Sequence, residues 1–132
     1  MKISAIVKYT KGEQVGVDID ENITDVVIDT RRIKHTEHTL FVALKGTRDG
    51  HDFINTAYNL GIRYFLVNEQ YTNTAYEDAV FIKVKNTLEA LQQIAGAHRN
   101  LFNIPIIGIT GSNGKTIVKE WLYQLLEPNY NI

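Results

Sequence analysis

The segment Gly108–Thr116 has the residue types and spacing of a phosphate-binding loop. It runs Gly-Ile-Thr-Gly-Ser-Asn-Gly-Lys-Thr. Gly111 and Gly114 lack a Cβ, so the backbone can adopt positive φ there and bring its amides close to phosphate oxygens. Lys115 would reach the β- and γ-phosphates of a nucleotide, and the Thr116 hydroxyl would bind Mg²⁺.

The flanking residues support this interpretation, although the loop departs from the usual G-x-x-x-x-G-K-[ST] pattern. Ile109 stands where that pattern has its first glycine. The apolar, β-branched run Ile104–Ile109 predicts a strand that is buried on both faces. Beyond the loop, apolar residues at helical spacing predict a helix that Pro128 ends; these are Val118, Trp121, Leu122 and Leu125. A strand-to-helix turn directs free amides and the helix dipole at one point, which suits an anion. The alternative is a glycine-rich turn with an incidental lysine.

The composition of the 132-residue chain excludes several classes of protein. There is no cysteine, so neither a disulfide framework nor a thiolate metal site can form. Fourteen basic and 15 acidic residues nearly cancel, so no net field attracts nucleic acid or an anionic membrane. No apolar run approaches the roughly 20 residues of a membrane span, and Met1–Ser4 does not lead into the apolar core of a signal peptide. We therefore expect a cytoplasmic protein that binds neither nucleic acid nor a membrane.

Upstream of the loop, short apolar runs alternate with helical patterns. Strands are predicted at 14–17, 22–28, 40–44, 64–67 and 79–84, and a helix at 3–9. A second helix would be capped by Asp52 and ended by Gly61. This alternation predicts an α/β fold with a small, mostly parallel sheet.

A domain boundary is expected near Lys85. Asn86–Glu89 is typical of a capping box, and it would start a helix ending near Phe102. That helix would turn one apolar face to its neighbours, formed by Leu88, Leu91, Ala95 and Leu101. The expected domains are therefore residues 1–85, and residues 86–132 as the first βα unit of a phosphate-loop domain.

Two polar segments follow predicted strands, where ligand sites of open α/β sheets lie. Asp29–Arg31 offers a carboxylate, a hydroxyl and a guanidinium, which suit a ribose, a base edge or a phosphate. Lys45–His51 adds two cations, two glycines and a histidine in a loop that we expect to be flexible enough to wrap a ligand. The alternative is that Asp29 only caps a turn and that the cations are solvated.

These segments together resemble the Mur ligases, the ATP-dependent amino-acid ligases of peptidoglycan synthesis. The similar stretches are Val27–Arg31, Leu40–Gly46 continuing through Asp49–Phe53, and Ile109–Thr116 followed by Val118–Glu120. The resemblance covers nearly the whole chain. It is strongest to the ligases that add D-alanyl-D-alanine to a UDP-N-acetylmuramoyl tripeptide, and their shorter loop accounts for Ile109.

The resemblance implies a role for each segment. Residues 1–85 would bind the UDP part of a UDP-N-acetylmuramoyl peptide through Thr30, Arg31, Lys45, Gly46, Asp49, Gly50 and His51. ATP would be bound by Gly111, Ser112, Asn113, Gly114, Lys115 and Thr116. Thr116 would also bind Mg²⁺, and Lys115 would act in catalysis by stabilising the transferring phosphoryl group. A substrate carboxylate would form an acyl phosphate, which the amine of D-alanyl-D-alanine displaces.

The family's remaining catalytic elements are expected beyond Ile132, so we expect the chain to be part of a longer ligase, weak in nucleotide binding and inactive alone. Such ligases are sometimes fused to an alanine racemase, which makes a fusion an open alternative. Two other functions stay open: another Mur-type or folylpolyglutamate synthase-like ligase, and a non-catalytic nucleotide-binding module.

Overall fold

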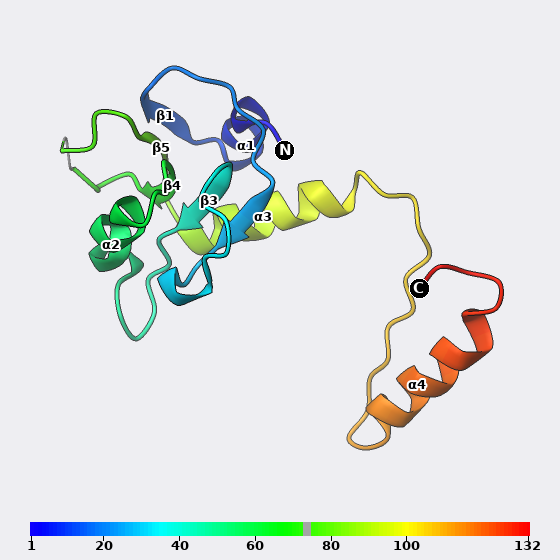
Figure 1. Ribbon diagram of the computed structural model, residues 1–132. Coiled ribbons are helices and arrows are strands. Elements are labelled where there is room, and N and C mark those ends of the chain that lie inside the picture. The colour runs from blue at the N-terminus through cyan, green and yellow to red at the C-terminus, as the bar shows by residue number, and fades with distance from the viewer. Residues whose placement is uncertain (73–74) are drawn as a thin grey trace. The chain divides into compact units, whose positions relative to one another are not determined.

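The computed structural model describes residues 1–72 and 75–132 of the chain (Figure 1). It consists of two compact units, Met1–Phe102 and Asn103–Ile132. The first unit holds a five-stranded sheet with helices on both faces, and the second holds one helix. The α/β fold with a small, mostly parallel sheet is confirmed.

The strands of the first unit are ordered β1-β5-β4-β3-β2. Four of them are parallel to their neighbours, whereas β1 pairs antiparallel with β5 at one edge. Their bounds are β1 Glu13–Gly16, β2 Asp25–Val27, β3 Thr39–Val42, β4 Tyr64–Asn68 and β5 Val80–Val84. All five predicted strands of this unit exist, but the second is shorter than expected because only three of its residues pair with β3.

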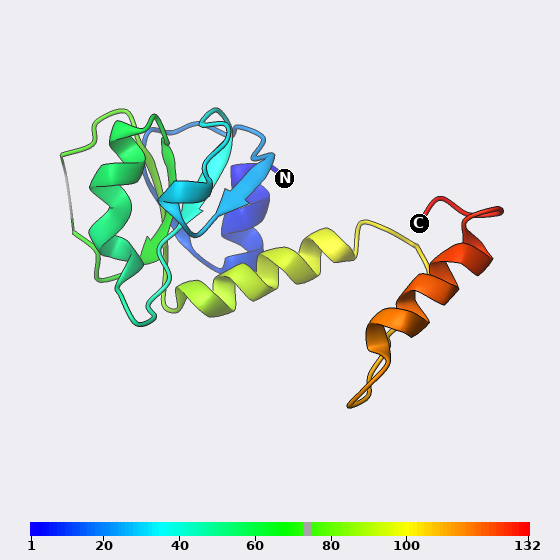
Figure 2. The same cartoon turned by 60° about the horizontal axis from the view of Figure 1, so that its bottom comes forward.

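Alternate residues of the central strands enter two separate cores. Leu40 and Val42 face the core under α1 (Ile3–Thr10) and α3 (Thr87–Arg99), where Ile6 and Ile94 are also buried. The opposite face of the sheet carries α2 (Ile54–Asn59) (Figure 2). Phe41, Phe65 and Phe81 of three adjacent strands pack together in the core on that face. Because side chains of a strand point alternately to its two faces, a continuous apolar run fills both cores at once.

Two local expectations about helices were wrong. Asp49, not Asp52, caps the turn before α2: its carboxylate accepts from the His51 amide, and a 3-10 turn, Gly50–Phe53, leads into the helix. In α3 the buried positions are Thr87, Ala90 and Ile94, whereas Leu88 and Leu101 of the expected apolar face are exposed. Both sets of positions recur at helical spacing. Packing of α3 against α1 and the sheet buries Thr87, Ala90 and Ile94, and Leu91 of the expected face is partly buried beside them.

Asn86 caps α3 as predicted, accepting hydrogen bonds from the amides of Leu88 and Glu89. The packing of α3 places it in the first compact unit, which therefore extends to Phe102. Assignment of residues 86–132 to a separate nucleotide-binding domain stays a prediction about function.

In the second unit, α4 spans Lys115–Leu126 after the phosphate-type loop, close to its predicted bounds. The predicted strand at 104–109 is absent, and Ile104, Ile106 and Ile107 are exposed. A strand that is apolar on both faces gains stability only from paired neighbours and covering layers, and residues 103–132 supply neither. No helix in the described part of the chain is both long enough and apolar enough to cross a membrane.

Candidate functional site

A cavity of about 530 Å³ opens at the carboxyl ends of the parallel strands. Three loops and the start of α3 form its walls. The lining residues are Lys45, Asp49, His51, Asn68, Gln70, Tyr71, Lys85, Asn86, Thr87 and Leu88. Two ammonium groups, a carboxylate, an imidazole, three carboxamides, a hydroxyl and a phenol ring thus surround one space. It lies at the edge of an α/β sheet where ligands bind.

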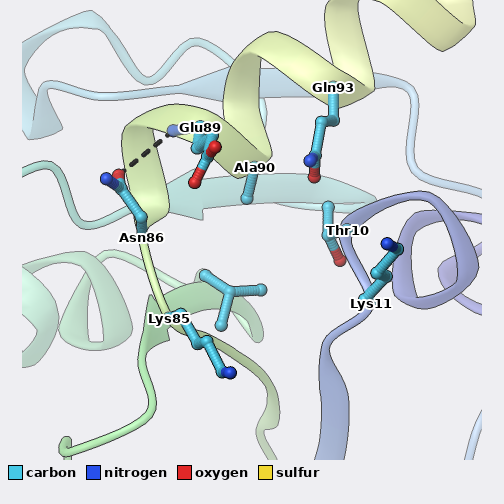
Figure 3. A pocket seen from close by; sticks show the side chains of 8 residues that line it. Thr10, Lys11, Lys85, Asn86, Glu89, Ala90 and Gln93 are labelled. Atoms are coloured by element: carbon cyan, nitrogen blue, oxygen red, sulfur yellow. Dashed lines mark hydrogen bonds between the residues drawn. The ribbon is translucent and has the colours of Figure 1, made fainter.

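A smaller cavity of about 270 Å³ lies beside it, between the end of α1 and the first turns of α3 (Figure 3). Lys85 and Asn86 line both cavities. Thr10 and Lys11 close the smaller cavity from the α1 side. Its lining contains neither the imidazole nor the phenol ring that the larger cavity has. The larger cavity is the candidate site.

The loop from Lys45 to His51 forms hydrogen bonds within its own backbone. Its ability to wrap a ligand stays a prediction. The Gly46 amide donates to the Arg48 carbonyl (3.2 Å), and the Gly50 amide donates to the Leu44 carbonyl (2.8 Å). Lys45 and Asp49 also form an antiparallel bridge. These bonds fix the backbone from which the Lys45, Asp49 and His51 side chains reach the cavity.

His51 is enclosed on one side of the cavity, with 16% of its side chain exposed. Its Nδ1 lies 2.6 Å from Oδ1 of Asp49, and its Nε2 accepts a hydrogen bond from the Asn68 amide (3.0 Å). Its ring also packs beside that of Tyr71, with centroids 5.6 Å apart. The backbone and side-chain hydrogen bonds from His51 lower the pKa of the Asp49 carboxyl below its usual value, so Asp49 remains anionic at neutral pH.

Thr30 and Arg31 lie after β2 at the same edge of the sheet, but neither lines the cavity. The Arg31 guanidinium instead forms a two-pronged ion pair with Asp29, with Nη2 2.7 Å from Oδ2 and Nε 3.0 Å from Oδ1. Asp29 also caps the 3-10 turn Thr30–Arg32 by accepting from the Arg31 amide. Of the predicted UDP contacts, the structure therefore gathers Lys45, Asp49 and His51, while Gly46 and Gly50 shape the loop.

The ion pair predicts how Asp29 titrates. Hydrogen bonds from the Arg31 side chain and amide lower the pKa of Asp29 from 3.8 to about 2. Because the folded-state pKa is the lower one, this pair stabilises the fold fully above about pH 4 and is lost as the pH falls through about 2. We expect carboxyl ¹³C NMR to show Asp29 titrating near pH 2, and Arg31→Ala to return its pKa toward 3.8.

Arg32→Ala is the matched control, because Arg32 acts on Asp29 only as a weaker, more distant charge. It should leave the Asp29 pKa close to that of the unsubstituted chain. Equal shifts in both variants would contradict the direct pairing.

In the second unit, Gly111 (φ 150°) and Gly114 (φ 78°) adopt the positive φ that their residue type predicted. Gly114 is the N-cap of α4 and provides no side chain to cap it. The Lys115 ammonium donates to the Gly111 carbonyl, which folds its side chain back over the loop. Thr116 lies in the exposed first turn of α4. The ATP and Mg²⁺ assignments of Gly111–Thr116 stay predictions.

Several lining residues were not predicted from the sequence. Asn68 ends β4, with Gln70 and Tyr71 directly after it, and Lys85 and Thr87 follow β5. The sequence does place polar residues at the ends of two predicted strands, and this pattern could have indicated them as site residues, because parallel strands end at one edge of the sheet. The described residues contain no group of three or more histidine or acidic side chains placed to hold a metal ion.

The fold and cavity define an α/β protein with a polar ligand site at the carboxyl edge of its sheet. The family profile described as "Mur ligase family, catalytic domain" matches residues 22–99, more than half of the chain. The chain belongs to the Mur ligase family.

Two curated relatives show how the family is named. The UDP-N-acetylmuramoyl-tripeptide--D-alanyl-D-alanine ligase of Bacillus subtilis (strain 168) is 34% identical over 132 residues, covering 98% of this chain and 28% of the relative. The UDP-N-acetylmuramoyl-L-alanyl-D-glutamate--2,6-diaminopimelate ligase of Clostridioides difficile (strain 630) is 34% identical over 137 residues, covering 99% of this chain and 27% of the relative.

Solved structures of Mur ligases have the same fold as this chain. MurF from Acinetobacter baumannii superposes with a TM-score of 0.78 at 26% identity, covering 96% of this chain and 27% of that one. MurF ligase from Thermotoga maritima, solved in complex with ADP, has a TM-score of 0.65 at 31% identity, covering 81% and 24%. The chain thus spans about a quarter of the length of these proteins. Their names give no support to a fusion with an alanine racemase.

Proposed function

We propose that this chain supplies the UDP-binding part and the phosphate loop of a ligase that joins D-alanyl-D-alanine to a UDP-N-acetylmuramoyl tripeptide. The reaction belongs to peptidoglycan synthesis in the cytoplasm, consumes ATP with Mg²⁺, and passes through an acyl phosphate. The observation that carries the proposal is the cavity at the carboxyl edge of the sheet. The name of the Bacillus subtilis relative supplies the two substrates.

The chemistry of the cavity suits a uridine diphosphate. Lys45 and Lys85 provide two cations for the two phosphates. The Gln70 carboxamide offers both a donor and an acceptor, which match a base edge or sugar hydroxyls. The side-chain oxygens of Asn68 and Asn86 already accept backbone amides, so these two residues would offer N–H donors to the ligand. Thr30 and Arg31 at the same edge stay proposed contacts; Arg31 would exchange its Asp29 partner for a phosphate.

The phosphate loop is proposed to bind MgATP through Gly111, Ser112, Asn113, Gly114, Lys115 and Thr116. The loop conformation, with two glycines at positive φ before α4, supports this proposal, as does ADP in the Thermotoga maritima structure. Lys115 would leave the Gly111 carbonyl to meet the transferring phosphoryl group, and Thr116 would bind Mg²⁺. ATP itself supplies the phosphoryl group that activates the substrate carboxylate.

Titration calorimetry of the chain with UDP tests the first part of the proposal. We expect Lys45→Ala and Lys85→Ala each to weaken UDP binding at least about tenfold, because a charge-assisted hydrogen bond contributes roughly 1.5–3 kcal/mol. Lys8→Ala, in the last turn of α1 and outside both cavities, is the matched control. Unchanged affinity in both cavity variants would contradict the assignment, and no binding by the folded chain would favour a module with another ligand.

A second function within the family is a diaminopimelate-adding ligase, because the Clostridioides difficile relative has the same identity to this chain. Both functions require UDP in the cavity. They differ in the amino-acid partner, so assays of the full-length protein with D-alanyl-D-alanine and with diaminopimelate separate them. Turnover with D-alanyl-D-alanine is the expected result.

A further inference from the structure

His51 connects three segments that form the walls of the cavity. It belongs to the loop after β3, and its Nδ1 meets Asp49 of that same loop at 2.6 Å. Its Nε2 accepts a hydrogen bond from the Asn68 amide at the end of β4 (3.0 Å). The ring therefore joins the loop after β3 to the end of β4. Both of its nitrogens already have hydrogen-bond partners within the protein.

Asn68 extends this connection to the segment after β5, which forms another wall of the cavity. Its side-chain Nδ2 donates to the Lys85 carbonyl after β5 (2.8 Å), while its Oδ1 accepts from the Gln70 amide (3.0 Å). We call Asp49, His51 and Asn68 the imidazole bridge. Lys45, Gln70 and Lys85, which line the cavity, lie on the backbone segments that this bridge ties together.

The bridge requires one protonation form of the imidazole. A backbone amide can only donate, so Nε2 must offer its lone pair to Asn68. The proton of the neutral ring then lies on Nδ1, where the Asp49 carboxylate accepts it. A proton on Nε2 would face the Asn68 N–H directly and would break the connection between the loops.

We infer that His51 is a positioning residue, which sets the spacing of the cavity walls and so the affinity for nucleotide, without itself forming a hydrogen bond to the ligand. This inference rests on the proposed function for the ligand and goes beyond it for the role of His51. A hydrogen bond to the ligand would require a free ring nitrogen, and the bridge uses both.

Two substitutions of His51 separate its contact with Asp49 from its contact with the Asn68 amide. The carboxamide of His51→Asn reaches the position of Nδ1, so it keeps the partner Asp49 but leaves the Asn68 amide without its acceptor. The longer His51→Gln places a carboxamide near Nε2, so it restores that acceptor. We expect UDP to bind His51→Asn about tenfold more weakly than the unsubstituted chain, and His51→Gln within about threefold of it.

Calorimetry with UDP and melting temperatures, measured on the same samples, give the outcomes. Equal affinity in the unsubstituted chain and both folded variants would overturn the positioning role, and so would equal losses in both. If the unsubstituted chain binds no UDP, the proposed function fails instead. Should His51→Asn not fold, ¹⁵N NMR of the imidazole in the unsubstituted chain decides: a protonated Nδ1 supports the bridge, and a protonated Nε2 overturns it.

Discussion

Phe65→Ala is expected to lower the free energy of unfolding of the first unit by about 4 kcal/mol. Phe65 lies in the middle strand of the sheet with none of its surface exposed. Its ring stacks on Phe81 (centroids 5.1 Å apart) and meets Phe41 edge-on (6.3 Å). Truncation leaves a cavity among these rings, and domains of this size have only about 5–15 kcal/mol to lose. Urea denaturation followed by far-UV circular dichroism measures the effect.

Trp121→Ala is the matched control, because it removes a still larger ring from the second unit. Trp121 is 63% exposed in α4, so its loss should change the free energy of unfolding of the first unit by less than about 0.5 kcal/mol. A large loss in the Trp121 variant, or a small one in the Phe65 variant, would contradict the distribution of buried surface described above.

Gly50→Ala is expected to destabilise the first unit by about 3 kcal/mol and to weaken UDP binding at least about tenfold. A Cβ at Gly50 would lie 2.6 Å from the Leu44 amide nitrogen, 2.7 Å from its carbonyl oxygen and 2.8 Å from the Ala43 carbonyl carbon. These are backbone atoms, so relief requires the loop itself to move. Its movement would displace Lys45 and Asp49 from the cavity. Thermal melts and UDP calorimetry of the same variant measure both effects.

Gly46→Ala, in the same loop, separates steric crowding from the general cost of losing a glycine. A Cβ there would meet only the Arg48 carbonyl oxygen, at an ordinary 3.9 Å. We expect a change in stability within about 0.5 kcal/mol and unchanged UDP affinity. If both alanine variants show the same stability and UDP affinity, then the close packing of Gly50 against the Ala43 and Leu44 backbone does not hold the loop in place.

Much of the first unit could be predicted from the sequence because its signals are local. Apolar runs such as Leu40–Leu44 and the largely apolar Ala79–Val84 predicted strands, and those strands separate two cores. Asn86 was recognised as a helix cap from its own side chain and its neighbours. In two places the sequence favoured the wrong local solution: the buried face of α3, and the cap before α2, where Asp49 rather than Asp52 caps the 3-10 turn that leads into the helix.

The predicted strand at 104–109 failed for a different reason. Its residues have strong β propensity, but a strand also requires hydrogen-bonding partners and cover from outside itself. Residues 103–132 provide no paired strand, and the apolar side chains remain exposed. Local preference is therefore a necessary condition here and not a sufficient one.

The sequence by itself determined the residue types at the ends of the strands, the two glycines at positive φ before α4, and the resemblance to the Mur ligases. Only the tertiary structure decided which of the polar residues share a cavity. Lys45, Asn68 and Lys85 are distant in sequence, and parallel pairing of β3, β4 and β5 brings them to one edge. It also decided that Arg31 pairs with Asp29 and that His51 joins two loops. Such contacts depend on the register and packing of the whole sheet, which no single segment encodes.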